Sequence, residues 1–466
     1  MTPAYFPKAD GMTVDLVVKD GKLVSSMGIL DGSVAIDGGV IVAVAKTPNL
    51  PNSDRTIDAR GKVILPGVLD GHTHTSLPPE DPSSGTRAAA KGGITTILEM
   101  PGTQLGCFNP GEFESKRGLY EEKSHINFCL HVGCASGYPE GNLTSMWEMG
   151  ATGAKFFVSS AGPNWPQTFD GEILDRLMEL ARVDGLALIH AENDQILRDN
   201  LRRLEAEGRR DYAAHMEWRP AIAEAECGQR VIRYLKETGC RGVIVHTSLP
   251  ETVLNAQRAR LEGVNVHVET CPQYLYLTKE DVKQRGPWVK FAPPARDRAK
   301  VAKLWRLLEA GRIDTVASDH APYARERKEA GLEDIFAAPN GIPGVETLLP
   351  LMLTGVNEGR LGLERLSAVV SENPARIYGI YPRKGSFLPG SDGDFVILDM
   401  KRRWRIRGEE MLTACGWTPF DGFEARGAPV TSIIRGETVL EDGVVIADEG
   451  QGTFVARSTG RLGRIS

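Results

Sequence analysis

Two histidines, His72 and His74, stand two residues apart in the segment Pro-Gly-Val-Leu-Asp-Gly-His-Thr-His, which follows the apolar residues 63–65. In a strand, side chains two apart point to the same side, so both imidazoles would face one point. Such a pair at the end of a strand can chelate a metal ion. A generic His-x-His pair is more often two polar residues leaving a strand for a loop, but the preceding Asp70 favours the metal site.

Two further histidines, His190 and His246, end the short apolar runs 186–190 and 243–246. The C-terminal ends of barrel strands meet at one face, where active sites form, and imidazole is the commonest metal ligand. Each histidine alone could equally be a hydrogen-bonded core residue. Because the chain has only nine histidines, four at such positions indicate one common site.

Lys155 and Asp319 complete the set. Lys155 lies in the apolar run 153–158, where burial would favour a neutral amine. A neutral lysine can take up carbon dioxide, and the resulting carbamate can bridge two cations as a carboxylate does; the alternative is an ammonium that reaches the surface. Asp319 follows the apolar residues 316–317 and could bind a metal and exchange protons with water. The alternative for Asp319 is a helix cap or a turn before Pro322.

The elements that would position these side chains alternate along the middle of the chain. Short apolar runs are separated by helical stretches, of which the clearest are residues 172–183, 221–238, 251–261 and 299–310. Repeated β–α units with continuous apolar strands predict a parallel sheet covered by helices. We therefore expect an α/β fold with a (β/α)₈ barrel over residues 62–390. A doubly wound open sheet is the alternative, but no Gly-x-Gly-x-x-Gly turn follows the early strands.

The two ends of the chain have a different pattern. Residues 15–24 and 33–44 alternate as strands do, with turn signals at Asp20-Gly21 and Gly38-Gly39. Strand patterns return at residues 394–398, 433–440 and 443–446. We predict that residues 1–61 and 391–466 form one small β-sandwich, to which the C-terminal tail belongs.

Bulk properties exclude several classes of function. A formal net charge of −6 gives no electrostatic reason to bind nucleic acid or an anionic membrane. No apolar run is long enough for a membrane span, and residues 1–12 lack the apolar centre of a signal peptide. Seven cysteines without paired spacing argue against a disulfide framework. These features predict a cytoplasmic protein that acts on a small molecule.

In their order along the chain, the six residues resemble the amidohydrolase superfamily, in its cyclic-amide branch of hydantoinases, dihydropyrimidinases, allantoinases and dihydroorotases. The resemblance covers nearly the whole chain and includes the runs at 85–96, 318–322 and 373–375. It implies two divalent cations held by His72, His74, Lys155, His190, His246 and Asp319. The first two histidines would hold the more buried cation, the other two the second, and the lysine, carboxylated on its side-chain nitrogen, would bridge them.

The resemblance also implies a mechanism. A hydroxide shared by the cations would attack the ring carbonyl, and Asp319, a ligand of the buried cation, would carry the proton to the departing nitrogen. Zinc suits these nitrogen and oxygen ligands, although manganese, cobalt or iron also fit.

The substrate ring is less sharply indicated. Dihydroorotases carry an arginine directly after the His-x-His pair, where this chain has Thr75-Ser76, which disfavours that activity. Hydantoinases carry a tyrosine five residues after the bridging lysine; Ser160 at that position resembles allantoinases instead. The runs 271–275 and 339–341 resemble hydantoinases. By resemblance, Asn340 and the backbone near Ala292 would hydrogen-bond the edge of the ring, and each could instead be plain turn structure.

We therefore predict an allantoinase-like enzyme that converts allantoin to allantoate. A hydantoinase, a dihydropyrimidinase or another cyclic imide hydrolase is the alternative. A non-enzymatic interaction scaffold on the same fold would lack metal ligands, and deaminase-type relatives lack the bridging lysine, so both are disfavoured. We expect a homo-oligomer, a tetramer by resemblance, with no nucleic-acid or membrane partner.

Overall fold

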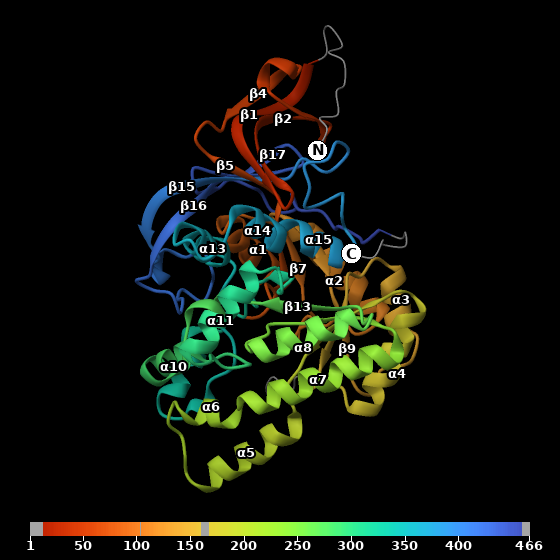
Figure 1. The fold of residues 1–466 in the computed structure, drawn as a ribbon, viewed down its shortest axis with the longest axis vertical. Coiled ribbons are helices and arrows are strands. Elements are labelled where there is room, and N and C mark those ends of the chain that lie inside the picture. Colours follow the sequence, from red (N-terminus) through yellow and green to blue (C-terminus); the bar gives the residue numbers. More distant parts are fainter. Residues whose placement is uncertain (1–12, 103, 160–166, 459–466) are drawn as a thin grey trace.

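The computed structural model describes residues 13–102, 104–159 and 167–458. A β-structure drawn in red and blue, the colours of the two chain ends, lies at the top of Figure 1, and a larger helix-covered body lies below it. Within the described residues, no helix combines the length and apolar character needed to cross a membrane.

The upper part is a nine-stranded sheet built from both ends of the chain. Its order is β18-β17-β16-β15-β5-β1-β2-β3, and β4 pairs with β1. The bounds are β1 (Thr13–Ser25), β2 (Gly28–Asp37), β3 (Val40–Ala45), β4 (Asn52–Asp58), β5 (Val63–Pro66), β15 (Phe395–Arg405), β16 (Glu424–Ile434), β17 (Glu437–Glu441) and β18 (Val444–Val445). Strand β5 joins the two ends, because it pairs with β1 on one side and with β15 on the other.

Alternation of apolar residues explains this sheet. Leu16 and Val18 of β1 are fully buried and pack with Ile36 of β2 and Ile433 of β16 in one apolar cluster. The turn predicted at Gly38-Gly39 separates β2 from β3, and both glycines have positive φ angles, 57° and 79°. The expected meeting of the two chain ends is therefore confirmed.

The lower part is a ring of parallel strands. One sheet has the order β14-β13-β12-β11-β10-β9 and the other β6-β7-β8. The bounds are β6 (Val68–Thr73), β7 (Ile94–Glu99), β8 (Asn127–Leu130), β9 (Val132–Cys134), β10 (Ala154–Phe157), β11 (Leu186–His190), β12 (Arg241–Ile244), β13 (Val266–Thr270) and β14 (Thr315–Val316). Only His131 separates β8 from β9, so these two form one interrupted barrel strand. A bridge between Thr73 and His320 closes the ring beyond β14, and the expected (β/α)₈ barrel is confirmed.

Helices follow most of the barrel strands and cover the barrel (Figure 1). Their bounds are α1 (Pro82–Lys91), α2 (Pro110–Lys123), α3 (Asn142–Glu148), α4 (Asp170–Arg182), α5 (Asp194–Ala206), α6 (Ala214–Trp218), α7 (Ala221–Thr238), α8 (Pro250–Leu261), α9 (Pro272–Tyr276), α10 (Lys279–Arg285), α11 (Arg298–Glu309), α12 (Arg325–Glu329), α13 (Leu348–Asn357), α14 (Leu363–Ser367) and α15 (Asn373–Ile377). The four helices predicted from the sequence are α4, α7, α8 and α11, displaced by two residues at most. Helix α7 ends at Gly239, whose φ of 69° suits a glycine cap.

A buried group of charges, the Lys384 cluster, joins the terminal sheet to the barrel. It consists of Lys384, Asp392 and Asp394, and the lysine nitrogen lies 2.8 Å and 2.5 Å from the two carboxylates. Asp394 also accepts hydrogen bonds from Asn127 of β8 and from the backbone of Arg435, between β16 and β17. Burial makes these ionic contacts costly to break singly, since the remaining charge stays desolvated. The division of the chain at residues 61/62 and 390/391 stays a prediction.

We expect Lys384→Met to destabilise the protein by about 3–5 kcal/mol, because it leaves two buried carboxylates without their shared ammonium. Lys22→Met, which removes an exposed ion pair with Asp31, should cost about 1 kcal/mol or less. Thermal unfolding followed by circular dichroism compares the two variants. Equal melting temperatures for both would contradict a stabilising role of the Lys384 cluster.

Candidate metal centre

Five of the six side chains singled out in the sequence lie at or just beyond the C-terminal ends of barrel strands, and the sixth, Lys155, lies inside a strand. His72 is in β6 and His74 just beyond it, Lys155 is in β10, and His190 ends β11. His246 and Asp319 follow β12 and β14 by two and three residues. All six line one pocket. Because parallel strands present their C-terminal ends on one face of a barrel, residues up to 247 positions apart come together.

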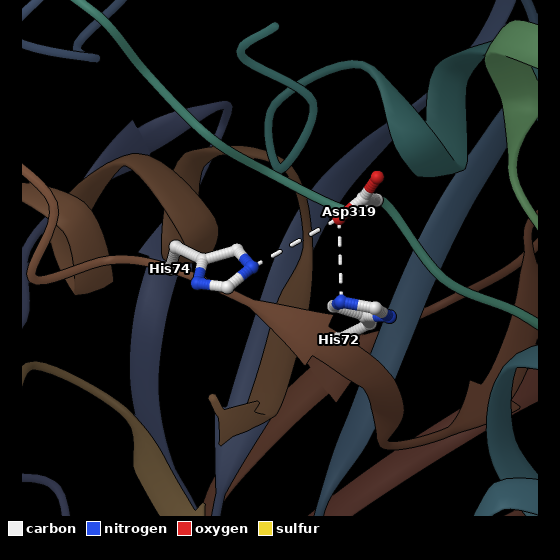
Figure 2. A group of neighbouring side chains, drawn as sticks. All are labelled: His72, His74 and Asp319. Carbon is white, nitrogen blue, oxygen red and sulfur yellow. Dashed lines mark ion pairs between the residues drawn. The ribbon is translucent and has the colours of Figure 1, made fainter. Parts of the chain in front are cut away.

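Three of these residues form a compact group around one point. His72 Nε2 lies 3.2 Å from Asp319 Oδ1, and His74 Nε2 lies 4.0 Å from the same oxygen (Figure 2). One donor atom from each of the three residues lies within 4.8 Å of the other two. Two imidazole nitrogens and one carboxylate oxygen at these separations suit a divalent cation such as zinc.

The other two histidines form a second pair beside the first. His190 Nδ1 and His246 Nε2 are 3.0 Å apart, and the rings of His246 and His72 have centroids 5.3 Å apart. Lys155 lies close to both pairs, with its Nζ 3.2 Å from His72 Nε2. The structure thus brings together two nitrogen-donor pairs, an amine and a carboxylate.

The chemistry of these donors fits a metal centre. Burial lowers the pKa of His72, His74 and His246 well below the usual histidine value, which keeps the imidazoles neutral and their lone pairs available. Burial also lowers the pKa of Lys155 and raises that of Asp319. Neutral imidazoles and an amine that readily loses its proton are the forms that metal binding and carbamate formation require.

Carboxylates behind the histidines fix which ring nitrogen faces the pocket. Glu269 Oε1 accepts from His72 Nδ1 at 2.9 Å, and Glu192 Oε2 accepts from His190 Nε2 at 2.8 Å. Each bond leaves the other nitrogen of the ring as the lone-pair donor toward the centre. The Arg219 guanidinium pairs with Glu192, and the Tyr378 hydroxyl donates to Glu269. Because all four residues are fully or almost fully buried, this support is shielded from water.

Sequence reasoning did not identify Glu192 or Glu269 as functional. Glu192 stands two residues after His190, and that spacing could have indicated a carboxylate able to reach back to the ring. Glu269 is 197 residues from His72, and no local pattern links them. Their pairing depends on closure of the barrel, in which only β14 lies between β13 and β6.

Two of the six residues have an unusual backbone. His246 and Asp319 have φ angles of 38° and 51°, in the left-handed region that residues other than glycine seldom adopt. Such conformations gather at functional sites, where the surrounding structure over-determines them. At Asp319 that support includes Asp70, whose Oδ1 accepts from the backbone N–H of Ser318 at 2.9 Å and from that of His72 at 3.3 Å. Asp70 therefore ties strand β6, which carries His72, to the loop that carries Asp319.

The structure describes two of the three residues that were expected to recognise the substrate. Asn340 and Ala292 both line the pocket, beside the metal-binding candidates. Ser160 lies outside the described residues. The pocket also has an apolar wall that the sequence did not predict, formed by Leu77, Phe157, Phe291 and Tyr323.

Comparison with known proteins places these observations in a family context. The family model described as the amidohydrolase family matches residues 63–439. The chain is 39% identical over 453 residues to an L-hydantoinase of Paenarthrobacter aurescens, with 95% of this chain and 98% of the relative covered. It is 37% identical over 449 residues to an allantoinase of Rubrobacter xylanophilus, with 95% and 97% covered.

Solved structures agree with this result. The L-hydantoinase from Arthrobacter aurescens superimposes with a TM-score of 0.91 at 38% identity, covering 95% of this chain and all of that chain. A dihydropyrimidinase from Brevibacillus agri gives a TM-score of 0.89 at 29% identity, covering 95% and 98%.

We expect Glu192→Gln to weaken metal binding about 10- to 100-fold, because the His190 ring loses the charged acceptor that fixes its orientation. Metal content after equilibration against a graded series of chelator concentrations measures the loss. Glu205→Gln, on the exposed face of α5, is the matched control and should bind metal as the unmodified protein does. A Glu192→Gln protein that folds and retains metal equally well would disprove the supporting role of Glu192.

Proposed function

The chain belongs to the amidohydrolase family, and we propose that it uses two divalent cations to hydrolyse a C–N bond of a hydantoin-type ring, with allantoin opened to allantoate. Activity on cyclic amides agrees with the family match and with relatives named allantoinase and hydantoinase. The single observation that carries the two-cation part of the proposal is the convergence of six potential ligands in one pocket.

The proposed ligand sets follow from the distances. His72, His74 and Asp319 would hold one cation, and His190 and His246 would hold the other. Zinc is the first choice for such donors, with manganese, cobalt and iron as alternatives. When bound, the cations would lower the pKa of a water molecule and polarise the ring carbonyl.

Lys155 would bridge the two cations after reacting with carbon dioxide. In that reaction the Nζ lone pair forms a bond to carbon, one C=O π bond breaks and its electron pair moves to oxygen, and one proton leaves the nitrogen for water. Burial lowers the pKa of Lys155, which favours the neutral amine that the reaction needs. Its position 3.2 Å from His72 Nε2, and in the same pocket as the other histidine pair, supports the bridging role.

Asp319 would move the proton during hydrolysis. Its carboxylate takes a proton from the attacking water as the new C–O bond forms, then gives it to the ring nitrogen as the C–N bond breaks. An amide nitrogen is a poor leaving group unless it is protonated, so both transfers are needed. Burial raises the pKa of this carboxyl group, and a bound cation would oppose that shift, so both act on the residue that must accept and release the proton.

Allantoin and 5-substituted hydantoins present the same ring, since allantoin is a hydantoin with a ureido group at position 5. The residues that would hold the ring edge, Asn340 and the backbone near Ala292, serve either substrate. A hydantoinase acting on apolar 5-substituents is the second candidate, because Leu77, Phe157 and Phe291 give the pocket an apolar wall. The small hydroxyl residue Ser160 supports allantoin.

The remaining parts of the proposal concern the cellular context. We propose a homo-oligomer, a tetramer by family resemblance, in the cytoplasm. Light scattering of the purified protein measures the oligomeric state directly.

We expect metal-loaded protein to hydrolyse allantoin faster than dihydroorotate, and Asp319→Asn to reduce turnover by at least about 100-fold, because the proton transfer is lost. Asp199→Asn, an exposed change on α5, is the control and should leave turnover unaltered. Release of the ring-opened carbamoyl product is followed by chromatography. An Asp319→Asn enzyme with near-normal turnover would refute the proton transfer by Asp319.

We expect protein prepared with ¹³C-bicarbonate and zinc to show one carbamate signal per chain by ¹³C NMR, and Lys155→Met to lack it. Other buried lysines, such as Lys116 and Lys384, remain in the variant and act as internal controls. A signal that persists in Lys155→Met, or that is missing from the unmodified protein, would contradict the bridging carbamate.

A further inference from the structure

Lys328 of α12 is a buried lysine outside the metal centre. It contacts the backbone of two segments that line the pocket. Its side chain is fully buried. Its Nζ donates to three backbone carbonyls, those of Lys290 at 3.0 Å, Pro339 at 3.0 Å and Gly341 at 2.9 Å. Two of these carbonyls flank Asn340, and the third lies two residues before Ala292. One side-chain nitrogen therefore joins the two segments that we propose to hold the edge of the substrate ring.

A second buried lysine, Lys290, extends the same contact. Its Nζ donates to the carbonyl of Ile335 at 2.6 Å and to that of Ala338, at the two ends of the turn before Asn340. Its own carbonyl accepts from the N–H of Gly341 at 3.0 Å as well as from Lys328. The segment 335–341 is thus fixed at several backbone atoms by two buried lysine side chains.

The segment is also held in register with the metal centre. Ile342 pairs with His320 in an isolated bridge, and the Ile342 carbonyl accepts from Ala321 at 2.9 Å. His320 is the neighbour of Asp319. Fixing residues 339–342 between Lys328 and this bridge sets the position of Asn340 relative to the proposed general base.

The number of carbonyl oxygens around Lys328 equals the number of N–H donors of an ammonium group. An ammonium has three N–H donors, and three carbonyl oxygens surround it within 3.0 Å. An apolar side chain would remove this donor from all three carbonyls, and only the Lys290 carbonyl would keep another, the N–H of Gly341. A buried carbonyl left without a donor is costly, because water cannot replace the lost hydrogen bond. Burial and the nearby Lys290 lower the pKa of Lys328 well below the usual lysine value. The three backbone carbonyls are the hydrogen-bond acceptors that its Nζ contacts.

We propose that Lys328, supported by Lys290, is a positioning residue for substrate specificity, which sets the alignment of Asn340 and of the backbone at Ala292 against the ring edge. This inference rests on the proposed function, since it concerns how the same site recognises its ring. Lys328 does not line the pocket and would act only through the backbone that it holds.

The first test needs no activity. In metal-loaded protein, hydrogen–deuterium exchange of residues 335–345 is compared between the unmodified chain and Lys328→Met. We expect faster exchange confined to this segment and to residues 290–292. Lys116→Met is the matched control, because Lys116 is equally buried and also donates to a carbonyl, that of Met100 at 2.7 Å. It should leave exchange of residues 335–345 unaltered. Unchanged protection of residues 335–345 in Lys328→Met would overturn the proposal.

The second test measures recognition of the ring. The ratio of kcat/KM for hydantoin over 2-thiohydantoin reports on contacts to the ring edge away from the reacting carbonyl. We expect Asn340→Ala to lower this ratio about threefold to tenfold, because one hydrogen bond to the ring is lost. Lys328→Met should reproduce most of that loss, and the double variant should lose little more. Additive losses in the double variant, or an unchanged ratio in Lys328→Met, would overturn the proposal.

Misfolding of Lys328→Met and failure of the proposed function can both be distinguished from failure of this proposal. If Lys328→Met does not fold, Lys328→Arg keeps a cation but not the three-way geometry, and it should give the same changes with smaller size. If the unmodified enzyme hydrolyses neither of these rings nor allantoin, the proposed function fails, while the exchange experiment still decides the role of Lys328.

Discussion

Several basic side chains lie against one another in the pocket, shielded from water, and this packing is the constraint on which the rest of the structure depends. Four imidazoles and one amine would repel if protonated, and burial holds their pKa values down. Neutral nitrogen donors that lie so close together can direct their lone pairs at bound cations, which stabilises the arrangement. The barrel makes such packing attainable, because strands far apart in sequence end at the same face.

Acidic groups outside the pocket stabilise this arrangement, some in direct contact with the histidines and others farther from them. Glu269 and Glu192 orient the rings, and Asp70 ties the strand of His72 to the loop of Asp319. Farther away, the Lys384 cluster fixes the barrel to the terminal sheet. Several of these buried groups have partners far away in the sequence, as Glu269 has in His72 and Asp70 has in Ser318. Changes to these residues therefore affect the centre without removing any of its donors.

Helices, strands and single candidate ligands could be predicted from the sequence, whereas the contacts between distant residues could not. Period-two spacing identified His72 and His74, and apolar runs ending in a polar residue identified His190, His246 and Asp319, because those patterns are local. The helix at 221–238 was predicted at its observed bounds, since apolar spacing and Gly239 both mark it. The pairing of Glu269 with His72 and of Lys328 with the carbonyls around Asn340 could not be predicted, because each depends on tertiary contacts that leave no periodic signal. The apolar wall around Phe157 and Phe291 was missed for the same reason.

The most direct test of the account is the position of the metal ions in a crystal of the zinc-loaded protein, found by anomalous scattering at the zinc edge. We predict two peaks, one about 2.0–2.2 Å from the nitrogens of His72 and His74 and an oxygen of Asp319, the other at a similar distance from His190 and His246. Electron density extending from Lys155 should reach both. A single peak, or two peaks with the Lys155 side chain directed away from them, would contradict the account.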